Sequence, residues 1–120
     1  MSVSYKDLTV WQKSMELTAE VYRLVGKLPK EETYALSDQM RRSVVSIPSN
    51  IAEGQDRNSS RAFVQFLNIA RGSRAELETQ LLICQKIGYL SESDVKETIC
   101  LLNEIGKMLS ALINKLTTDN

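Results

Sequence analysis

The sequence contains no histidine, and its 120 residues include only two cysteines, two prolines and five glycines. Without histidine, the chain cannot form a Ser-His-Asp triad, a Cys-His pair or a histidine-containing zinc site. The scarcity of glycine and proline leaves little of the turn chemistry that an all-β fold requires. These absences favour a fold built from helices.

Other absences narrow the class of protein. Cys84 and Cys100 are too few for a disulfide framework, so we expect reduced thiols and a cytoplasmic protein. No apolar run approaches the roughly 18 residues of a membrane span, and the N-terminus lacks the layout of a signal peptide. No glycine-rich phosphate loop and no cluster of carboxylates is evident. We therefore expect no cofactor, no metal, no contact with a membrane and no enzymatic activity.

Four stretches carry apolar residues at helical spacing, within a composition typical of a folded protein (42% hydrophobic, 25% charged). They predict helices over about 8–27, 35–55, 60–87 and 92–116. The breaks between them carry ordinary stop and start signals: Pro29, Gly54 and the residues after it, a capping Ser59 or Ser60, Gly88, and a capping box of Ser91 with Asp94. Because the connections are short, we expect one domain over 1–120, an all-α, up-down-up-down antiparallel four-helix bundle.

The second helix contains Pro48, which removes an amide and should bend the helix. Two helices with a break near Ile47 are the alternative. The apolar stripe continues in phase across the proline, which favours one helix kinked at Pro48. That stripe is Met40, Val44, Ile47 and Ile51.

Core stripes are expected on the other three helices as well. The first is Leu8, Trp11, Met15, Thr18, Tyr22 and Val25. The third helix offers Phe63, Phe66, Ala70, Ser73, Leu77, Leu81 and Cys84. The fourth carries an unbroken 4-3-4-3-4-3 seam of Val95, Ile99, Leu102, Gly106, Leu109, Ile113 and Leu116.

Three helices carry apolar residues beyond these stripes, and a monomeric bundle needs only one apolar face on each helix. Wide faces can simply fill a small core. Surplus apolar surface on three helices favours an interface instead, so we predict a homo-oligomer. Its interface residues are Val10, Leu17, Val21, Leu24, Val64, Leu82, Leu101, Ile105, Met108 and Leu112.

Charge is segregated although the net charge is zero. Residues 41–75 carry six arginines against Glu53 and Asp56, a local charge of +4, and no lysine. Two interpretations stay open: a solvated face with i,i+4 pairs such as Arg57 with Glu53 and Arg74 with Glu78, or contact with nucleic-acid phosphate. The candidate nucleic-acid-binding residues are Arg41, Arg42, Arg57, Arg61, Arg71 and Arg74.

A polar motif of Ser46, Pro48, Asn50, Glu53 and Gly54 lies in the second helix. We favour a structural role, in which Ser46 and Asn50 satisfy backbone freed by Pro48 and bond across to the third helix. A ligand site is the alternative.

Several strings together resemble a known family. They are Leu8-x-Val10-Trp11-Gln12, Tyr34-x-Leu36, Gln39-x-x-Arg42, Ser46-x-Pro48-x-Asn50-Ile51-Ala52-Glu53-Gly54, Phe63-x-x-Phe66-Leu67-x-x-Ala70-x-Gly72-Ser73-x-x-Glu76-Leu77 and Gly88-Tyr89-Leu90. The chain is similar to the bacterial four-helix-bundle proteins of the 23S rRNA intervening-sequence family. The resemblance implies a ring-shaped homopentamer. The related accessory variability protein of diversity-generating retroelements, a basic pentamer, binds nucleic acid and a reverse transcriptase.

Two functions follow as hypotheses. The first is a non-enzymatic, homopentameric protein that binds RNA or DNA, is associated with rRNA, and contacts phosphate through its arginines without regard to sequence. The second is a protein-interaction scaffold or accessory subunit, for example of a reverse transcriptase, in which the arginines meet acidic side chains. Binding that falls steeply with salt, or a partner retained after nuclease treatment, would separate them.

Overall fold

All regular elements in residues 4–118, which the computed structural model describes, are helical. Two short 3-10 helices, η1 (Tyr5–Asp7) and η2 (Lys30–Glu32), accompany four α-helices. The α-helices are α1 (Thr9–Val25), α2 (Leu36–Asp56), α3 (Ser60–Lys86) and α4 (Glu92–Thr118). The four predicted helices are confirmed, with only small shifts at their ends. The predicted domain of 1–120 includes 1–3 and 119–120, which lie outside the described residues.

The predicted signals at both ends of α3 are confirmed. The Ser59 hydroxyl accepts a hydrogen bond from the Ala62 amide at 3.3 Å, which caps the start of the helix. At the other end Gly88 has a φ of +88°, a conformation that L side chains rarely adopt. The Tyr89 amide donates to the Cys84 carbonyl and the Gly88 amide to the Gln85 carbonyl, the pattern of a Schellman motif.

The start of α4 has the predicted capping box. The Ser91 amide donates to the Asp94 carboxylate at 2.9 Å, and the Asp94 amide donates to the Ser91 hydroxyl at 3.1 Å. The same carboxylate pairs with Lys27, just beyond the end of α1, at 3.0 Å. These bonds fasten the turn before α4 to the end of α1. The backbone bond from Ser91 and the bond from Lys27 lower the pKa of Asp94 to about 2.

We expect Asp94→Ala to destabilise the protein in a pH-dependent way. Because the folded pKa lies below the unfolded one, the carboxylate contributes stability above about pH 4. That contribution is lost as the pH falls toward 2. The difference in urea midpoint between wild type and Asp94→Ala should therefore shrink over this range. Glu97→Ala is the control, a change on the same helix at a residue that forms no ion pair within residues 4–118; a difference that stays constant with pH contradicts the assignment.

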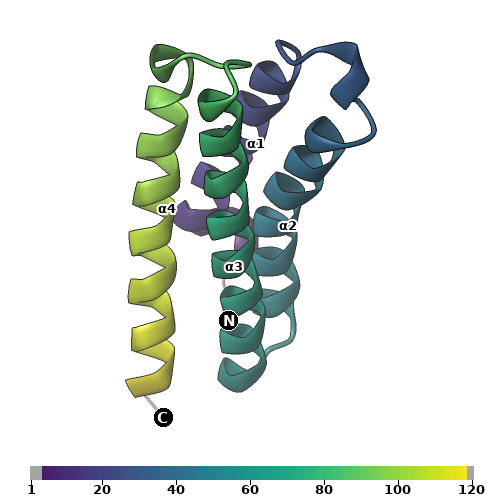
Figure 1. The fold of residues 1–120 in the computed structure, drawn as a ribbon. Helices are drawn as coiled ribbons and strands as arrows, with labels where there is room; N and C mark the ends of the chain where they lie inside the picture. Colours follow the sequence, from purple (N-terminus) through teal and green to yellow (C-terminus); the bar gives the residue numbers. More distant parts are fainter. Residues whose placement is uncertain (1–3, 119–120) are drawn as a thin grey trace.

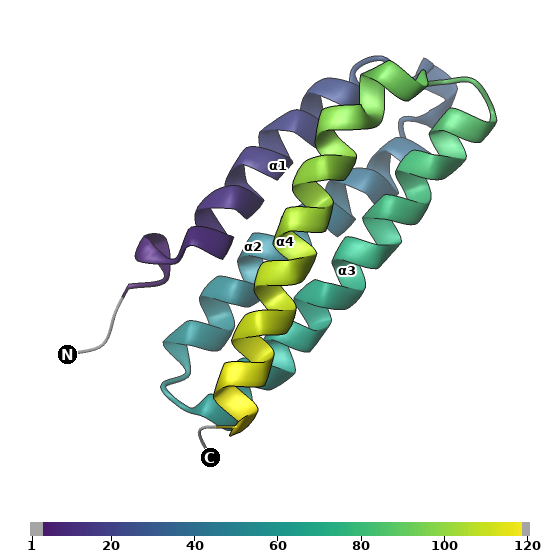
Figure 2. The same cartoon turned by 90° about the vertical axis from the view of Figure 1, so that its left-hand side faces the viewer.

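The four helices lie side by side, and successive helices run in opposite directions (Figures 1 and 2). The bundle measures 46 × 23 × 20 Å. At about 1.5 Å per residue, the 27-residue helices α3 and α4 are about 40 Å long and span most of it, whereas the 17 residues of α1 cover only about 26 Å. One end of the bundle is therefore built mainly from the other three helices.

The α2 helix continues through Pro48, so the alternative of two helices is wrong. The bend at Pro48 stays a prediction. Polar bonds do cross to α3, as expected: Ser46 bonds to Ser73 at 2.8 Å, and Ser43 donates to Glu76 at 2.8 Å. The side-chain amide of Asn50 donates to the Ser46 carbonyl. It does not donate to the Val44 carbonyl, which Pro48 leaves without its helical donor.

Gly54 brings α2 and α3 close together. A Cβ atom there would lie 2.7 Å from the Cβ of Phe66 and 3.0 Å from the Cδ1 of Phe63. The expectation that Gly54 helps to end α2 needs correction, because the helix continues to Asp56 and the reversal occurs at Asn58, whose φ is 62°. Gly54 is therefore a packing residue inside the helix.

The α2 stripe is confirmed, since Met40, Val44, Ile47 and Ile51 are all fully buried. In α3, Leu67 and Gln80 are buried, while Phe66 and Ser73 are only partly buried. In α4 the buried set includes Thr98 and Ile105 in place of Ile99 and Gly106. At Leu67, Thr98 and Ile105 the core lies a single residue away from the predicted position.

The prediction for α1 is wrong about which face is inside. Val10, Leu17, Val21 and Leu24, predicted at an oligomer interface, lie in the core of the protomer, as does Ile105 of α4. Met15 and Tyr22, predicted in the core, are exposed. The inward face is mostly aliphatic, and its one polar residue, Ser14, donates to the Val10 carbonyl, whereas Trp11, Thr18 and Tyr22 on the other face tolerate the edge of a core.

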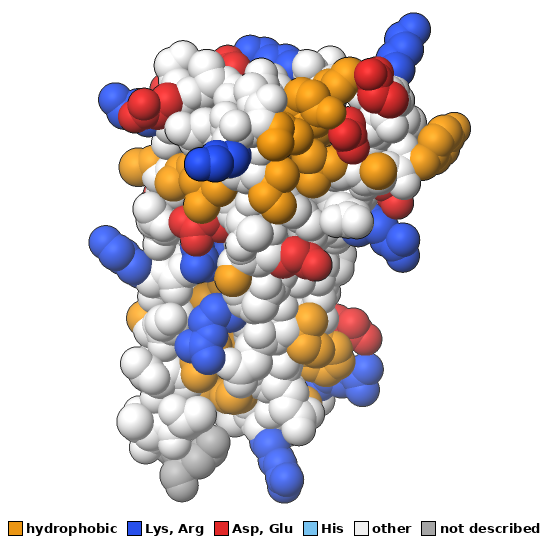
Figure 3. Space-filling model, in the orientation of Figure 1, with side chains coloured by type: hydrophobic (Ala, Val, Ile, Leu, Met, Phe, Trp, Pro, Cys, Tyr) orange, Lys and Arg blue, Asp and Glu red, His pale blue; other side chains and the backbone are white. Residues whose placement is uncertain are grey.

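The remaining predicted interface residues stay accessible. Val64, Leu101, Met108 and Leu112 are partly buried against the core, and Leu82 is 51% exposed. Ile69, Ile83 and Ile87 of α3 are exposed as well. Hydrophobic side chains gather over the upper part of the face on which α3 lies (Figure 3). That these side chains contact another copy stays a prediction.

Candidate functional site

The six candidate arginines are distributed over three parts of the surface. Arg41 and Arg42 lie near the start of α2, where both approach Asp38, at 4.0 and 3.9 Å. Arg41 also donates to the Thr33 carbonyl at 3.0 Å. These two guanidinium groups are partly neutralised by their own helix, as the solvated-face interpretation predicts.

Arg57 and Arg61 flank the turn between α2 and α3. Arg57 pairs with Glu53 at 3.1 Å and lies over the ring of Phe66, 5.1 Å from its centre. The predicted pair is therefore confirmed, and Arg57 is held against the α2–α3 side. No ion pair is recorded for Arg61 among the described residues. It lines a hollow of about 630 Å³ between the start of α3 and Thr117 near the end of α4.

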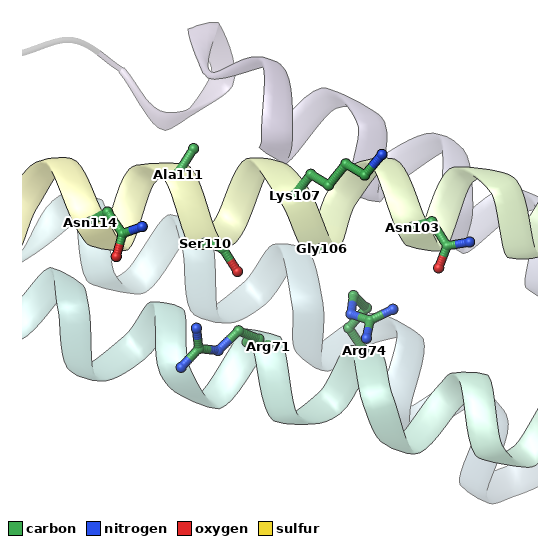
Figure 4. A pocket seen from close by; sticks show the side chains of 8 residues that line it. All are labelled: Arg71, Arg74, Asn103, Gly106, Lys107, Ser110, Ala111 and Asn114. Atoms are coloured by element: carbon green, nitrogen blue, oxygen red, sulfur yellow. The ribbon is translucent and has the colours of Figure 1, made fainter.

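Arg71 and Arg74 face α4 across a groove of about 660 Å³ (Figure 4). In Figure 4 the Arg74 side chain rises from α3 toward α4 and the Arg71 side chain extends along α3; α4 contributes Asn103, Ser110 and Asn114. Lys107 lies at the rim, extending along α4, and Gly106 and Ala111 add no bulk. No Asp or Glu lines the groove. Its lining is therefore basic and polar, the combination that attracts anions.

Arg74 lies low in this groove, with its side chain only 18% exposed. Its Nη1 atom is 3.7 Å from the Glu78 carboxylate and 3.5 Å from the Leu102 carbonyl oxygen. The predicted pair of Arg74 with Glu78 is thus confirmed, but both contacts are long. The buried Nε atom has no hydrogen-bond partner. A guanidinium with five donors is therefore poorly satisfied by the protein's own groups.

Arg71 is more exposed, and its Nη2 atom donates to the Asn68 side chain at 2.8 Å. An amide oxygen orients the guanidinium without neutralising its charge. No carboxylate partner is recorded for Arg71 or Lys107 in the described part of the chain. Arg61 lies about 15 Å from Arg71 along α3 at 1.5 Å per residue, and it lines a separate hollow. The structure thus separates Arg61, Arg71 and Arg74 from the other three candidates.

Sequence reasoning missed the contribution of α4. Lys96, Asn103, Lys107, Ser110 and Asn114 lie on its outer face at spacings of three, four and seven, with no carboxylate among them. This uncharged and basic face of α4 could have been recognised from the sequence. Its link to Arg71 and Arg74 could not, because the sequence of one helix does not show which residues of another helix it borders.

The polar motif makes contacts within the protein: Ser46 and Asn50 form hydrogen bonds, Glu53 forms an ion pair, and Gly54 packs against α3. Its remaining residue, Pro48, is buried. None of these residues lines the α3–α4 groove.

Residues 4–118 offer few other groups that could bind a metal or react. No group of three or more His, Cys, Asp or Glu side chains there could hold a metal ion. Burial raises the pKa of the Cys84 thiol to about 11, so this thiol is unreactive at neutral pH. No helix in the described range is both long and apolar enough to cross a bilayer.

Comparisons with known proteins agree with the fold. Residues 6–111 match the family model described as 23S rRNA-intervening sequence protein. A solved structure from Bacteroides thetaiotaomicron, described as a protein of unknown function from the S23 ribosomal protein family, is also similar. It shares 29% identity and superposes with a TM-score of 0.81, over 88% of this chain and 98% of the other. No curated protein matches the chain.

Proposed function

The chain belongs to the 23S rRNA-intervening sequence protein family, and from this membership and its surface we propose that it is a non-enzymatic, rRNA-associated nucleic-acid-binding protein of the cytoplasm. One observation carries the proposal. Arg71 and Arg74 face Lys107 and three uncharged polar side chains in a groove that no carboxylate lines. The net charge of zero does not oppose binding, because the local field at the groove decides what approaches it.

Arginine suits this role for a physical reason. Its planar fork donates to two phosphate oxygens at once, and such charge-assisted bonds are about twice as strong as neutral ones. Of the six candidates, Arg61, Arg71 and Arg74 lie on the α3–α4 side. Arg41, Arg42 and Arg57 lie elsewhere, near the start of α2 and at the α2–α3 turn, and do not line the groove. We therefore propose that phosphate contact centres on the first three and on Lys107.

The binding experiment is direct. Fluorescence anisotropy with labelled single-stranded RNA should show binding at about 50 mM salt. With four phosphate contacts and a slope of about −0.7 per contact, raising the salt to about 200 mM should weaken it roughly fiftyfold. No binding to any RNA or DNA at the lower salt contradicts the proposed function.

We also propose that the protein acts as a homo-oligomer, as the resemblance to pentameric relatives implies. Partly buried Leu101, Met108 and Leu112 on α4 and exposed Met15 on α1 support this. So does a hollow of about 430 Å³ at the end of the bundle that α1 leaves uncovered, lined by Leu8, Phe63, Leu112 and Leu116 among others. An oligomer repeats the same groove on every copy and adds avidity.

Sedimentation equilibrium at micromolar concentration tests the oligomer. We expect a mass five times the 13.5 kDa of one chain. Met108→Glu should shift the population toward monomer, because it places a charge where apolar side chains of two copies would meet. Lys96→Glu, on the outer face of α4, is the control. A monomer at all concentrations contradicts the proposal.

A protein-interaction scaffold is the second candidate. The observation that favours it is the exposed aliphatic group of Leu82, Ile83 and Ile87 near the end of α3, with Tyr34 almost fully exposed. Large apolar side chains gathered on a surface commonly mark contacts with proteins. A single stoichiometric partner that is retained after nuclease treatment would support this function over the first.

A further inference from the structure

Gly106 determines where Arg74 lies. A Cβ atom at this position would be 3.0 Å from Nε, 3.1 Å from Cδ and 3.3 Å from Cζ of Arg74. Glycine in the interior of a helix is unfavourable relative to alanine. Here its missing side chain lets the guanidinium lie against the backbone of α4. Any larger residue requires the Arg74 side chain to shift away from α4.

The position that Gly106 permits is not explained by contacts within the chain. Arg74 makes only the two long contacts to Glu78 and Leu102, and its buried Nε is unpaired. Burying an unsatisfied donor is unfavourable, so such a group calls for a reason. Because Nε is buried against α4, an anion in the groove would accept from the terminal nitrogens of the guanidinium, whose only contacts are the two long ones, with Arg71 as a second donor from the preceding turn of α3.

The size of the groove indicates more than a lone anion. A volume of about 660 Å³ exceeds what one phosphate group fills. Beside the arginines, Asn103, Ser110 and Asn114 present amide and hydroxyl groups that both donate and accept. Amide side chains of this kind match the edges of nucleobases and the hydroxyls of ribose.

The recessed position of Arg74 favours an unpaired nucleotide over a duplex. A duplex is a stiff cylinder whose phosphates meet side chains that protrude from a surface. An unpaired nucleotide can turn out of its strand and enter a groove between two helices. We propose that the α3–α4 groove binds one unpaired nucleotide unit, with its phosphate on Arg71 and Arg74 and its base or sugar against Asn103, Ser110 and Asn114. This inference rests on the proposed function and names its ligand class.

Two substitutions test the groove without damage to the core. Gly106→Ala pushes Arg74, a flexible side chain, out of its position, and alanine favours the helix. Arg74→Met keeps the apolar stem and removes the charge. Each should weaken binding of a 12-nucleotide single-stranded RNA at least about tenfold, the loss of one charge-assisted contact. Gly72→Ala is the matched control, because Gly72 is exposed on α3 and nothing lies within 4 Å of its Cβ position.

The probes are the 12-nucleotide RNA, the same RNA paired with its complement, a nucleoside 5′-monophosphate and inorganic phosphate, measured by calorimetry, with circular dichroism to verify folding. We expect the single strand to bind more tightly than the duplex and, of these two, only the single strand to respond to both substitutions. Monophosphate binding that depends on Arg74, without RNA binding, would leave the groove assignment standing and reject the nucleic-acid function. RNA binding that neither substitution weakens would overturn the inference and leave the proposed function intact.

Discussion

Replacing Arg71 and Arg74 together by glutamine is expected to lower the affinity for single-stranded RNA about a hundredfold. Each guanidinium contributes a charge-assisted contact worth about 1.5–3 kcal/mol, and 1.4 kcal/mol corresponds to a factor of ten. Both lie one turn apart on α3 and line the same groove. Glutamine is preferred to glutamate, because a second carboxylate beside Glu78 would be repelled.

The matched control is the double substitution Arg23→Gln with Arg42→Gln. It changes the net charge by the same amount but affects exposed residues of α1 and α2 that pair with Glu20 and Asp38. Exposed pairs of this kind contribute little to stability. Anisotropy titrations at one salt concentration compare the two variants. If the control loses as much affinity as the groove variant, net charge rather than the groove determines binding.

Gly54→Ala is expected to destabilise the fold by about 1–3 kcal/mol, the usual effect of overpacking a close helix contact. The new Cβ atom would lie 2.7 Å from the Cβ of Phe66, which is attached directly to the backbone of α3 and cannot rotate away. The two helices must therefore move apart, and α2 and α3 form the most extensive helix pair of the bundle. This outweighs the gain of up to about 1 kcal/mol that alanine brings to a helix.

Gly72→Ala is the same chemical change without the contact. Because its Cβ position is open, the helix preference should dominate and raise the stability by up to about 1 kcal/mol. Urea unfolding of both variants gives the comparison. Opposite signs support the close approach of α2 and α3 at Gly54, and equal stabilisation by both contradicts it.

The sequence predicted the helices and most of the core, because apolar spacing and capping residues act locally. The capping box at Ser91 and the glycine after α3 are such signals, and both were confirmed. The prediction of the buried α2 stripe was correct because only one face of that helix is aliphatic. In each of these cases the information lies within a few residues of where it acts.

The face of α1 was assigned wrongly because both of its stripes are apolar. The cue that separates them is chemical: Leu17, Val21 and Leu24 are wholly aliphatic, whereas Trp11, Thr18 and Tyr22 carry a polar atom. Spacing alone treats the two stripes as equal. The same limit applies to α4, where Ile105 enters the core and Gly106 does not.

The groove itself was beyond prediction from one sequence. It depends on which helices are neighbours and on a contact between Arg74 and Gly106, which are far apart along the chain. Six arginines looked like one basic segment, yet α2 and α3 direct them to different sides and neighbouring carboxylates engage several of them. The sequence gives the number of charged residues, and only the fold shows where on the surface they lie.

The salt dependence of RNA binding tests the central claim, that the α3–α4 groove contacts phosphate. The logarithm of the binding constant is plotted against the logarithm of salt concentration for wild type and for Arg71→Gln with Arg74→Gln. Loss of two contacts to a single strand should reduce the slope by about 1.4. The Arg23→Gln with Arg42→Gln control should keep the wild-type slope. Parallel lines for wild type and the groove variant would contradict the account.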